Sequence, residues 1–444
     1  MIFGVVGQDA GARQRYAELA HQHYVAQGAR RREAVVSLAE VSRAIGLSRS
    51  SLYRHWETAA DLSNALVGHL ATTSVGWHHH LRLDPGEPVA EAVRRLFADP
   101  RAYEGLAIWP AITTDPASSD VRLRCARFER AFVARLARHL ELTAPAGVEH
   151  PVPWTDLAVA VAALIDGATN AWAVLRPEPG MASNPALSDV IVDVIADLVG
   201  RYPAAVTGPD IPIDAPAEDD ELEEPTPGAR SVLERIAAAV AAGTLSVDPA
   251  EHRLVDVEDL ARRTGVTSRF LFQLWPTAAD LNGDIIEVAW ARLRANAHRE
   301  DLAVATELAR AGGTELSSGE RVRWAARGAD PLHSPEGTGI IPLLALFGSP
   351  TLAARSRSLL ADGWLAESVI PSASALQAVG AQLRPGRTLL DAAVLSAVRQ
   401  LGMWRIVGMH ETIGGRRLEL EGEQLPATGI AMFLMSHAII TTGR

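Results

Sequence analysis

One short segment of the chain, residues 43–55, gathers side chains that could bind the phosphates and base edges of a nucleic acid. Its arginines are positively charged, and its hydroxyl and imidazole groups can donate hydrogen bonds to phosphate oxygens or bases. The candidate contact residues are Arg43, Ser48, Arg49, Ser50, Ser51, Tyr53, Arg54 and His55. Residues 1–56 contain eight arginines and four acidic residues, whereas the whole chain has a net charge of −11. A basic end on an acidic protein indicates docking on a polyanion.

The composition excludes several kinds of catalytic site. The chain contains no lysine, so it cannot use a phosphate-binding or Schiff-base lysine. Its single cysteine, Cys125, cannot form an internal disulfide or a multi-cysteine zinc site, and its amphipathic flanks favour a buried side chain. His78, His79 and His80 would point about 100° apart on a helix, which favours a solvated helix end over a metal site. We therefore expect no metal, no cofactor and no enzyme activity, and a cytoplasmic location.

The elements that must hold the contact residues occur twice in the chain. Residues 36–67 return 219 residues later, at 255–286, with ten of 32 positions identical and no gap. In each copy, apolar residues spaced by three and four predict two helices, separated by a glycine. In the first copy, Ser37 and Ser48 are expected to cap these helices, and Gly46 to end the first one. This is the layout of a DNA-reading helix-turn-helix.

The residue types of the first copy follow a specific pattern. Its elements are a Glu-Val-x-Arg sequence at the end of residues 39–43, a Gly-Leu-Ser turn at 46–48, and Leu-Tyr-x-His-aromatic at 52–56. In these elements the copy resembles the TetR family of transcriptional regulators, and the second copy resembles it more loosely. The resemblance implies a three-helix DNA-binding head, in which Tyr53 contacts a phosphate. It also implies that a helical bundle for effector binding and dimerisation follows each head.

The second copy keeps the scaffold residues but changes the surface that would contact DNA. Four of the contact positions are replaced by Phe270, Phe272, Gln273 and Leu274. Residues 229–275 contain six arginines and six acidic residues, so no net positive charge is available to displace the counterions of DNA. We expect this copy to pack on another surface. The alternative is DNA contact through Arg262, Arg263 and Arg269.

These patterns predict an all-α chain of two tandem TetR-like units, each a three-helix head followed by a helical bundle. The expected boundaries are 1–60 for the first head, 61–202 for the first bundle, 203–228 for a linker, 229–279 for the second head and 280–444 for the second bundle. The linker is rich in proline and acidic residues, a composition typical of a flexible tether about 28 Å long.

A long apolar segment, Trp154–Leu175, lies where the TetR resemblance implies a dimerisation helix that would pair the two units. It contains Asp156, Asp166 and Asn170, which favours a buried helix over a membrane span. Overlaying residues 156–175 on residues 388–407 pairs the two tryptophans of these segments. The candidate dimerisation residues are Leu157, Val161, Leu164, Trp172 and Trp404. We expect the two halves to form a pseudo-dimer within one chain; the alternative is a homodimer of whole chains.

By resemblance, the bundle after the first head would bind a small-molecule effector. The candidate pocket residues are Trp77, Leu106, Trp109, Ile112 and Phe128, whose apolar side chains favour a hydrophobic ligand. The leading interpretation is a transcriptional regulator, in this family commonly a repressor, that binds double-stranded operator DNA. The effector would change the tilt of the helix that begins near Asp61. The alternatives are an effector-binding or protein-interaction module that has lost DNA binding and, last, an enzyme.

Overall fold

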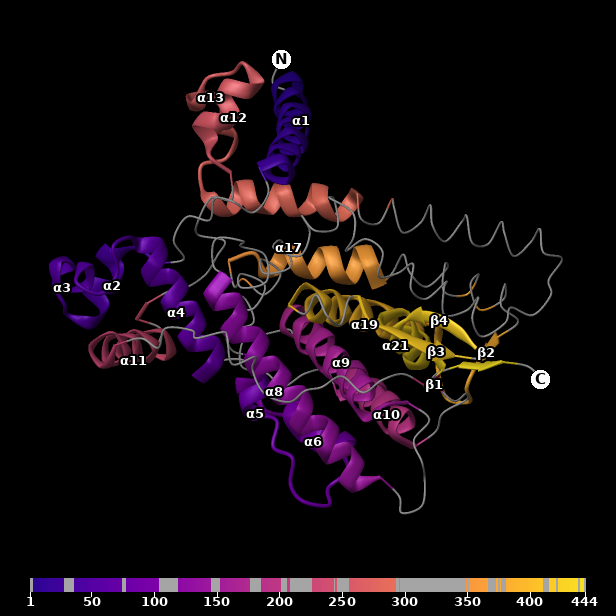
Figure 1. The fold of residues 1–444 in the computed structure, drawn as a ribbon. Coiled ribbons are helices and arrows are strands. Elements are labelled where there is room, and N and C mark those ends of the chain that lie inside the picture. Colours follow the sequence, from indigo (N-terminus) through magenta and orange to yellow (C-terminus); the bar gives the residue numbers. More distant parts are fainter. Residues whose placement is uncertain are drawn as a thin grey trace.

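The fold is described from a computed structural model of the chain. The described residues are 3–27, 36–73, 77–103, 119–144, 152–175, 185–200, 206–207, 226–242, 244–245, 255–292, 295, 349, 351–365, 373, 376, 381–409, 415–420, 422–437 and 440–442. The chain is mostly helical, as predicted (Figure 1). None of the described helices is long and apolar enough to cross a membrane.

The first half of the chain forms a series of helices. They are α1 (Phe3–Gln27), α2 (Leu38–Ile45), α3 (Arg49–Tyr53), α4 (Ala59–Thr73), α5 (Trp77–His80), α6 (Val89–Phe97), the 3-10 helix η1 (Pro100–Tyr103), α8 (Ser119–Thr143), α9 (Trp154–Leu175) and α10 (Pro185–Gly200). The helix α9 packs against α8 and α10, and α4 packs against α8. The predicted buried helix at Trp154–Leu175 therefore lies at the centre of this half.

The second half begins with four helices in the same order as α1, α2, α3 and α4 of the first half. Its helices are α11 (Pro227–Ala241), α12 (Val257–Thr264), α13 (Ser268–Leu274), a helix over residues 278–292, α17 (Ala353–Ser358), the π-helix η5 (Leu359–Leu365), α19 (Leu389–Met409) and α21 (Ala427–His437). The helix at 278–292 begins 219 residues after α4, the same spacing that separates the two sequence copies.

Five short strands depart from the all-α prediction. A three-stranded antiparallel sheet contains β1 (Val206–Thr207), β3 (Arg417–Leu420) and β4 (Glu423–Pro426), in the order β1-β3-β4. A second antiparallel pair joins β2 (Ala381–Leu383) to β5 (Ile440–Thr442). Because Val206 pairs with Leu420, the start of the predicted linker at 203–228 is held on a hairpin of the second half. Leu418 and Leu420 are both buried, as alternation along a strand requires.

The helices α9 and α19 pack against each other and join the two halves. At their crossing, a methyl group on Gly167 would overlap the backbone carbonyl of Val398, and one on Gly402 would overlap that of Ala163. The contact is reciprocal, so Gly167 corresponds to Gly402, at an offset of 235 residues. The same offset aligns the first residues of the two helices. The sequence overlay of Trp172 on Trp404 is therefore wrong by three residues, because both segments are alanine-rich and match in more than one register.

The first helix of each half lies against the helix-turn-helix of the other half. The helix α11 packs against α2 and α4, and α1 packs against α12 (Figure 1). One hydrophobic core contains Leu38, Leu52 and Trp56 together with Leu233 and Ile236 of α11. The structure thus differs from the expected division, in which residues 1–60 and 229–279 each form a complete head.

Candidate nucleic-acid interface

The first helix-turn-helix has the local geometry that its sequence predicts. The Ser37 hydroxyl accepts from the Glu40 amide and the Glu40 carboxylate accepts from the Ser37 amide, so a capping box starts α2. Gly46 has a φ of 66°, a left-handed conformation that ends α2 and turns the chain into α3. The Ser48 hydroxyl accepts from the Ser51 amide and caps α3. These caps fix the direction in which α3 leaves the turn.

The predicted contact residues lie together on and around α3. The side chains of Leu52 and Trp56 are buried in the head, whereas Tyr53 is 53% exposed. The candidates Arg43, Ser48, Arg49, Ser50, Arg54 and His55 are also exposed, and Ser51 is half-buried. Arg54 donates to the Ser51 hydroxyl at 3.0 Å, which orients its guanidinium along α3.

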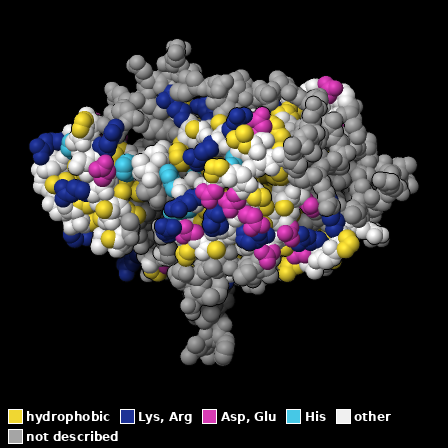
Figure 2. All heavy atoms as spheres, turned by 90° about the horizontal axis from the view of Figure 1, so that it is seen from below, with side chains coloured by type: hydrophobic (Ala, Val, Ile, Leu, Met, Phe, Trp, Pro, Cys, Tyr) yellow, Lys and Arg dark blue, Asp and Glu magenta, His cyan; other side chains and the backbone are white. Residues whose placement is uncertain are grey.

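The arginines around α3 have no carboxylate partner in the described part of the chain. Among the described residues, no carboxylate forms an ion pair with Arg43, Arg49 or Arg54. Figure 2 shows dark-blue basic side chains spread over the end of the molecule that holds α2, α3 and α4, whereas acidic side chains gather nearer the middle of this face. Guanidinium groups in this situation can bind phosphate oxygens.

His55 has a different environment from the other candidates. A methyl group on Gly228, at the start of α11, would lie 3.1 Å from the His55 ring. The ring also packs against Trp56, with 5.4 Å between ring centroids. His55 is therefore an exposed side chain that lies at the junction with α11.

The second helix-turn-helix has the same backbone but different surface chemistry. Asp256 and Thr267 cap α12 and α13, and Gly265 has a φ of 71°. Arg262 and Arg263 both pair with Asp259, at 3.0 and 3.3 Å. The corresponding position of the first copy is Glu40, whose carboxylate is engaged in the capping box.

The recognition face of the second copy is partly covered. Phe270 packs edge-on against Tyr16 of α1, with ring centroids 5.5 Å apart, and Phe272 is 41% exposed. Arg269 is exposed. These features agree with the expectation that this copy packs on another surface, while Arg269 keeps the alternative of DNA contact open.

The two heads, as they are assembled in the structure, differ in net charge. The first head consists of α11 and residues 36–56, which contain five arginines and two acidic residues. The second head consists of α1 and residues 255–275, which contain five arginines and five acidic residues. Only the first head therefore has a net positive charge to attract a polyanion.

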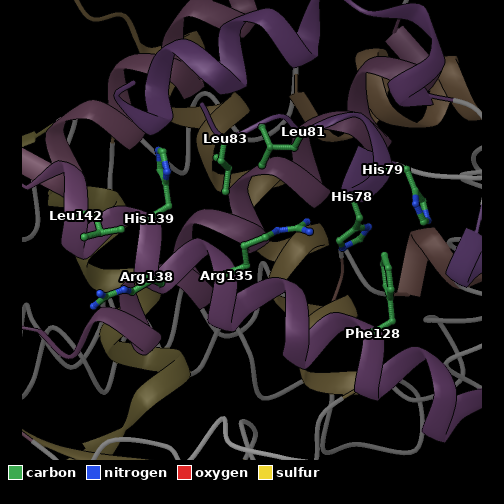
Figure 3. Close-up of a pocket in the computed structure, with 9 residues that line it drawn as sticks. All are labelled: His78, His79, Leu81, Leu83, Phe128, Arg135, Arg138, His139 and Leu142. Atoms are coloured by element: carbon green, nitrogen blue, oxygen red, sulfur yellow. The ribbon is translucent and has the colours of Figure 1, made fainter. Parts of the chain in front are cut away.

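A pocket of about 530 Å³ opens on the first bundle between the α5 region and α8 (Figure 3). Its lining residues are His78, His79, Leu81, Leu83, Phe128, Arg135, Arg138, His139 and Leu142. Of the five predicted pocket residues, Phe128 lines it. Trp77 is fully buried beside it, stacked on His78 and donating to Asp166. Leu106, Trp109 and Ile112 lie outside the described residues.

The pocket chemistry is more polar than expected from the sequence. Figure 3 shows the Arg135 side chain extending from α8 toward His78. His78 pairs with Glu129 at 2.7 Å, and both side chains are fully buried. The prediction of a solvated helix end is thus wrong for His78, because α5 is a single turn pressed against the core by Trp77. Within the described part of the chain, no group of three or more acidic, histidine or cysteine side chains could hold a metal ion.

The predicted dimerisation residues are all buried: Leu157, Val161, Leu164, Trp172 and Trp404. Asp156, at the start of α9, accepts two hydrogen bonds from Arg416, at 2.8 and 2.7 Å. This bidentate pair links the central helix of the first half to the residue before β3. Cys125, as expected, is buried in the core beneath the first head.

No protein-family model, curated protein or solved structure matches this chain. Its function must therefore be inferred from its own residues.

Proposed function

We propose that the protein is a TetR-like transcriptional regulator that binds operator DNA through its first head. The observation that carries this proposal is the exposed cluster of Arg43, Arg49, Tyr53 and Arg54 on a capped helix-turn-helix, where no described carboxylate neutralises the arginines. The second head has the same backbone, but it pairs two of its arginines internally. The contrast within one chain favours DNA binding by one head.

In the proposed complex, α3 lies in the major groove with its capped N-terminus toward the base edges. Tyr53 donates its hydroxyl to a phosphate, and Arg43, Arg49 and Arg54 contact the backbone or base edges. Ser50 and Ser51 are small enough to let the helix approach the floor of the groove.

The effector site is proposed at the pocket on α8, because this helix connects the pocket to the head. Phe128, Arg135 and His139 of α8 line the pocket, and α4 packs along the same helix. The Asp61 carboxylate accepts from the Thr58 amide at 2.9 Å, so α4 starts directly after the recognition element. A ligand that shifts α8 would therefore tilt α4 and move α3. The mixed lining favours a ligand with an apolar body and an anionic group.

The packing of α9 on α19 supports an intrachain pseudo-dimer as the state in which the two heads are held. Both Gly167 and Gly402 are needed for the close approach of the helices. The α9–α19 crossing pairs the two halves within one chain, so a homodimer of whole chains would need a different interface.

The test is binding of the full chain to a genomic fragment library at two salt concentrations. The triple variant Arg49→Ala/Tyr53→Phe/Arg54→Ala should weaken binding and lower the salt slope by about 0.9 for each phosphate that is no longer neutralised. The matched control, Arg262→Ala/Arg263→Ala/Arg269→Ala, changes three arginines of the second head and should leave the affinity within about twofold. If no fragment binds the wild type at low salt, the alternative of a module without DNA binding replaces this proposal.

A further inference from the structure

We propose that the two repeats have exchanged their first helices, so that each head is completed by a helix from the other half of the chain. The DNA-contacting head would then be a composite of both repeats. Its third helix is α11, which precedes the second helix-turn-helix in the sequence. The helix α1, which precedes the first, completes the second head.

The seat of α11 on the first head is a continuous hydrophobic core. Val232, Leu233, Ile236 and Ala239 are buried there, and Ile236 is fully buried. They pack with Val41, Ile45, Leu52 and Leu66 of the first repeat. Arg235 donates to the backbone carbonyl of Ile45, the last residue of α2. A helix C-terminus leaves carbonyl groups without partners inside the helix, so this bond satisfies one of them.

The seat of α1 on the second head is held by charge as well as packing. Ala17 and Ala20 are buried, and Tyr16 contacts Phe270. Arg13 donates to Asp284 at 2.6 and 3.1 Å. His23 lies 3.0 Å from the Asp259 carboxylate.

The order of elements identifies these helices as exchanged partners. In each repeat, one helix precedes the helix-turn-helix: α1 ends at Gln27 before α2 begins at Leu38, and α11 ends at Ala241 before α12 begins at Val257. At about 3.3–3.6 Å per residue, the ten residues 28–37 can span roughly 35 Å and the fifteen residues 242–256 roughly 50 Å.

One ion pair makes the exchange specific. Asp284 lies on the helix 278–292, directly after the second helix-turn-helix, and the corresponding position of the first repeat is Ala65, so the carboxylate that pairs with Arg13 is absent at that position of the first repeat. Returning α1 to the first head would take the bidentate partner Arg13 away from the buried Asp284 and leave Trp275 and Arg355 as its donors, which is unfavourable. The same move would displace α11 from its core around Ile236.

The consequence is that the second repeat acts as a folding partner of the first head, although its own recognition surface no longer carries the DNA-contacting residue types. That the composite head also controls DNA affinity rests on the proposed function. The exchange itself can be tested without DNA.

The test is amide hydrogen exchange of the full chain, read by mass spectrometry, with one substitution in each exchanged helix. Ile236→Ala in α11 should speed exchange at residues 38–53 by about tenfold or more, with little change at 257–274. Tyr16→Ala in α1 should speed exchange at residues 257–274, with little change at residues 38–53. If Ile236→Ala does not fold, Ile236→Val, which removes one methyl group, should give the same pattern with a smaller change.

The opposite assignment would overturn the proposal. In an unexchanged protein, Ile236→Ala would loosen residues 257–274 and Tyr16→Ala would loosen residues 38–53. Equal acceleration of both heads by Ile236→Val would also overturn it. A wild type that binds no DNA would refute the proposed function but leave this result unaffected.

Discussion

Three donors converge on the buried carboxylate of Asp284, and its replacement by asparagine should selectively loosen the contact of α1 with the second half. Arg13 donates to it at 2.6 and 3.1 Å, Trp275 at 2.8 Å and Arg355 at 2.8 Å, so the group ties α1 and α17 to the second head. Its side chain is only 9% exposed. Asparagine has the same shape, but it lacks the charge and presents an amide group to one of the donors.

The magnitude follows from the number and exposure of these bonds. A hydrogen bond to a charged group contributes about 1.5–3 kcal/mol, and breaking a buried ion pair costs about 3–5 kcal/mol. The side chains of Arg13 and Arg355 are each 35% exposed, so water screens part of the loss. We expect Asp284→Asn to lower the free energy of local opening by about 2 kcal/mol, which corresponds to roughly a 30-fold increase in the open population.

The assay is hydrogen exchange over residues 3–27 and 255–286, because a chain of this size need not unfold in a single step. The control is Glu287→Gln, which also removes a carboxylate facing Arg355 but at an exposed pair 3.5 Å apart. That change should cost less than about 0.5 kcal/mol. If Asp284→Asn opens the second head no more than Glu287→Gln, the convergence of donors does not stabilise the contact and this reasoning is refuted.

The pH dependence of the same contact has a definite sign. Burial by itself would raise the pKa of Asp284, but hydrogen bonds from Arg13 and Trp275 and the charges of Arg13 and Arg355 lower it below its ordinary value of 3.8. The carboxylate therefore stabilises the fold above pH 3.8, and this contribution is lost as the pH falls toward the lowered pKa. The difference between the wild type and Asp284→Asn should accordingly be complete at pH 7 and shrink below about pH 4.

Two further predictions concern the helix crossing and a buried histidine. Gly402→Ala should lower the free energy of unfolding by about 1–3 kcal/mol or more, because the new methyl group meets the Ala163 carbonyl. The control Gly11→Ala, which has open space around it, should be neutral or stabilising. Thermal melts of both variants check this, and equal melting temperatures would contradict it. Burial and the nearby charge of Arg263 lower the pKa of His23 below its ordinary value of 6.5 despite Asp259, so the fold favours the neutral ring. Acidification from about pH 7.5 to about 5.5 should therefore loosen α1. Hydrogen exchange of residues 3–27 should show a step over this pH range, and His23→Gln should reduce it.

The local structure of the heads can be predicted from the sequence because each signal for it acts over a few residues. Ser37, Gly46 and Ser48 act on backbone groups within a few residues, so their caps and the left-handed turn could be predicted without knowing the rest of the fold. The buried helix α9 was equally readable from its apolar length. The helical pattern predicts that Arg49 and Arg54 point away from the face of Leu52 and Trp56, and both are exposed.

The remaining features depend on contacts between distant segments, which the sequence does not mark. The strand Val206–Thr207 gains its conformation from pairing with β3, more than 200 residues away. The burial of His78 depends on Glu129 of α8. The alanine-rich helices α9 and α19 match in several registers, and only the close approach at Gly167 and Gly402 fixes the register. Asp284 carried one usable signal, since an acidic residue stands where the first copy has Ala65.

The proposed exchange gives a physical reason for the unequal divergence of the two copies. If α11 completes the first head, substitutions in the second repeat that disturb Leu233 or Ile236 would damage the head proposed to bind DNA, so this part of the repeat must keep its apolar face. The α13 surface does not support the first head, so the polar residues proposed to contact DNA could be replaced there by Phe270 and Phe272 while the backbone of the second head stayed intact. A fold retained twice with one DNA-binding face is then the expected outcome of sharing helices between the halves, because each half needs the other's scaffold but only one recognition surface.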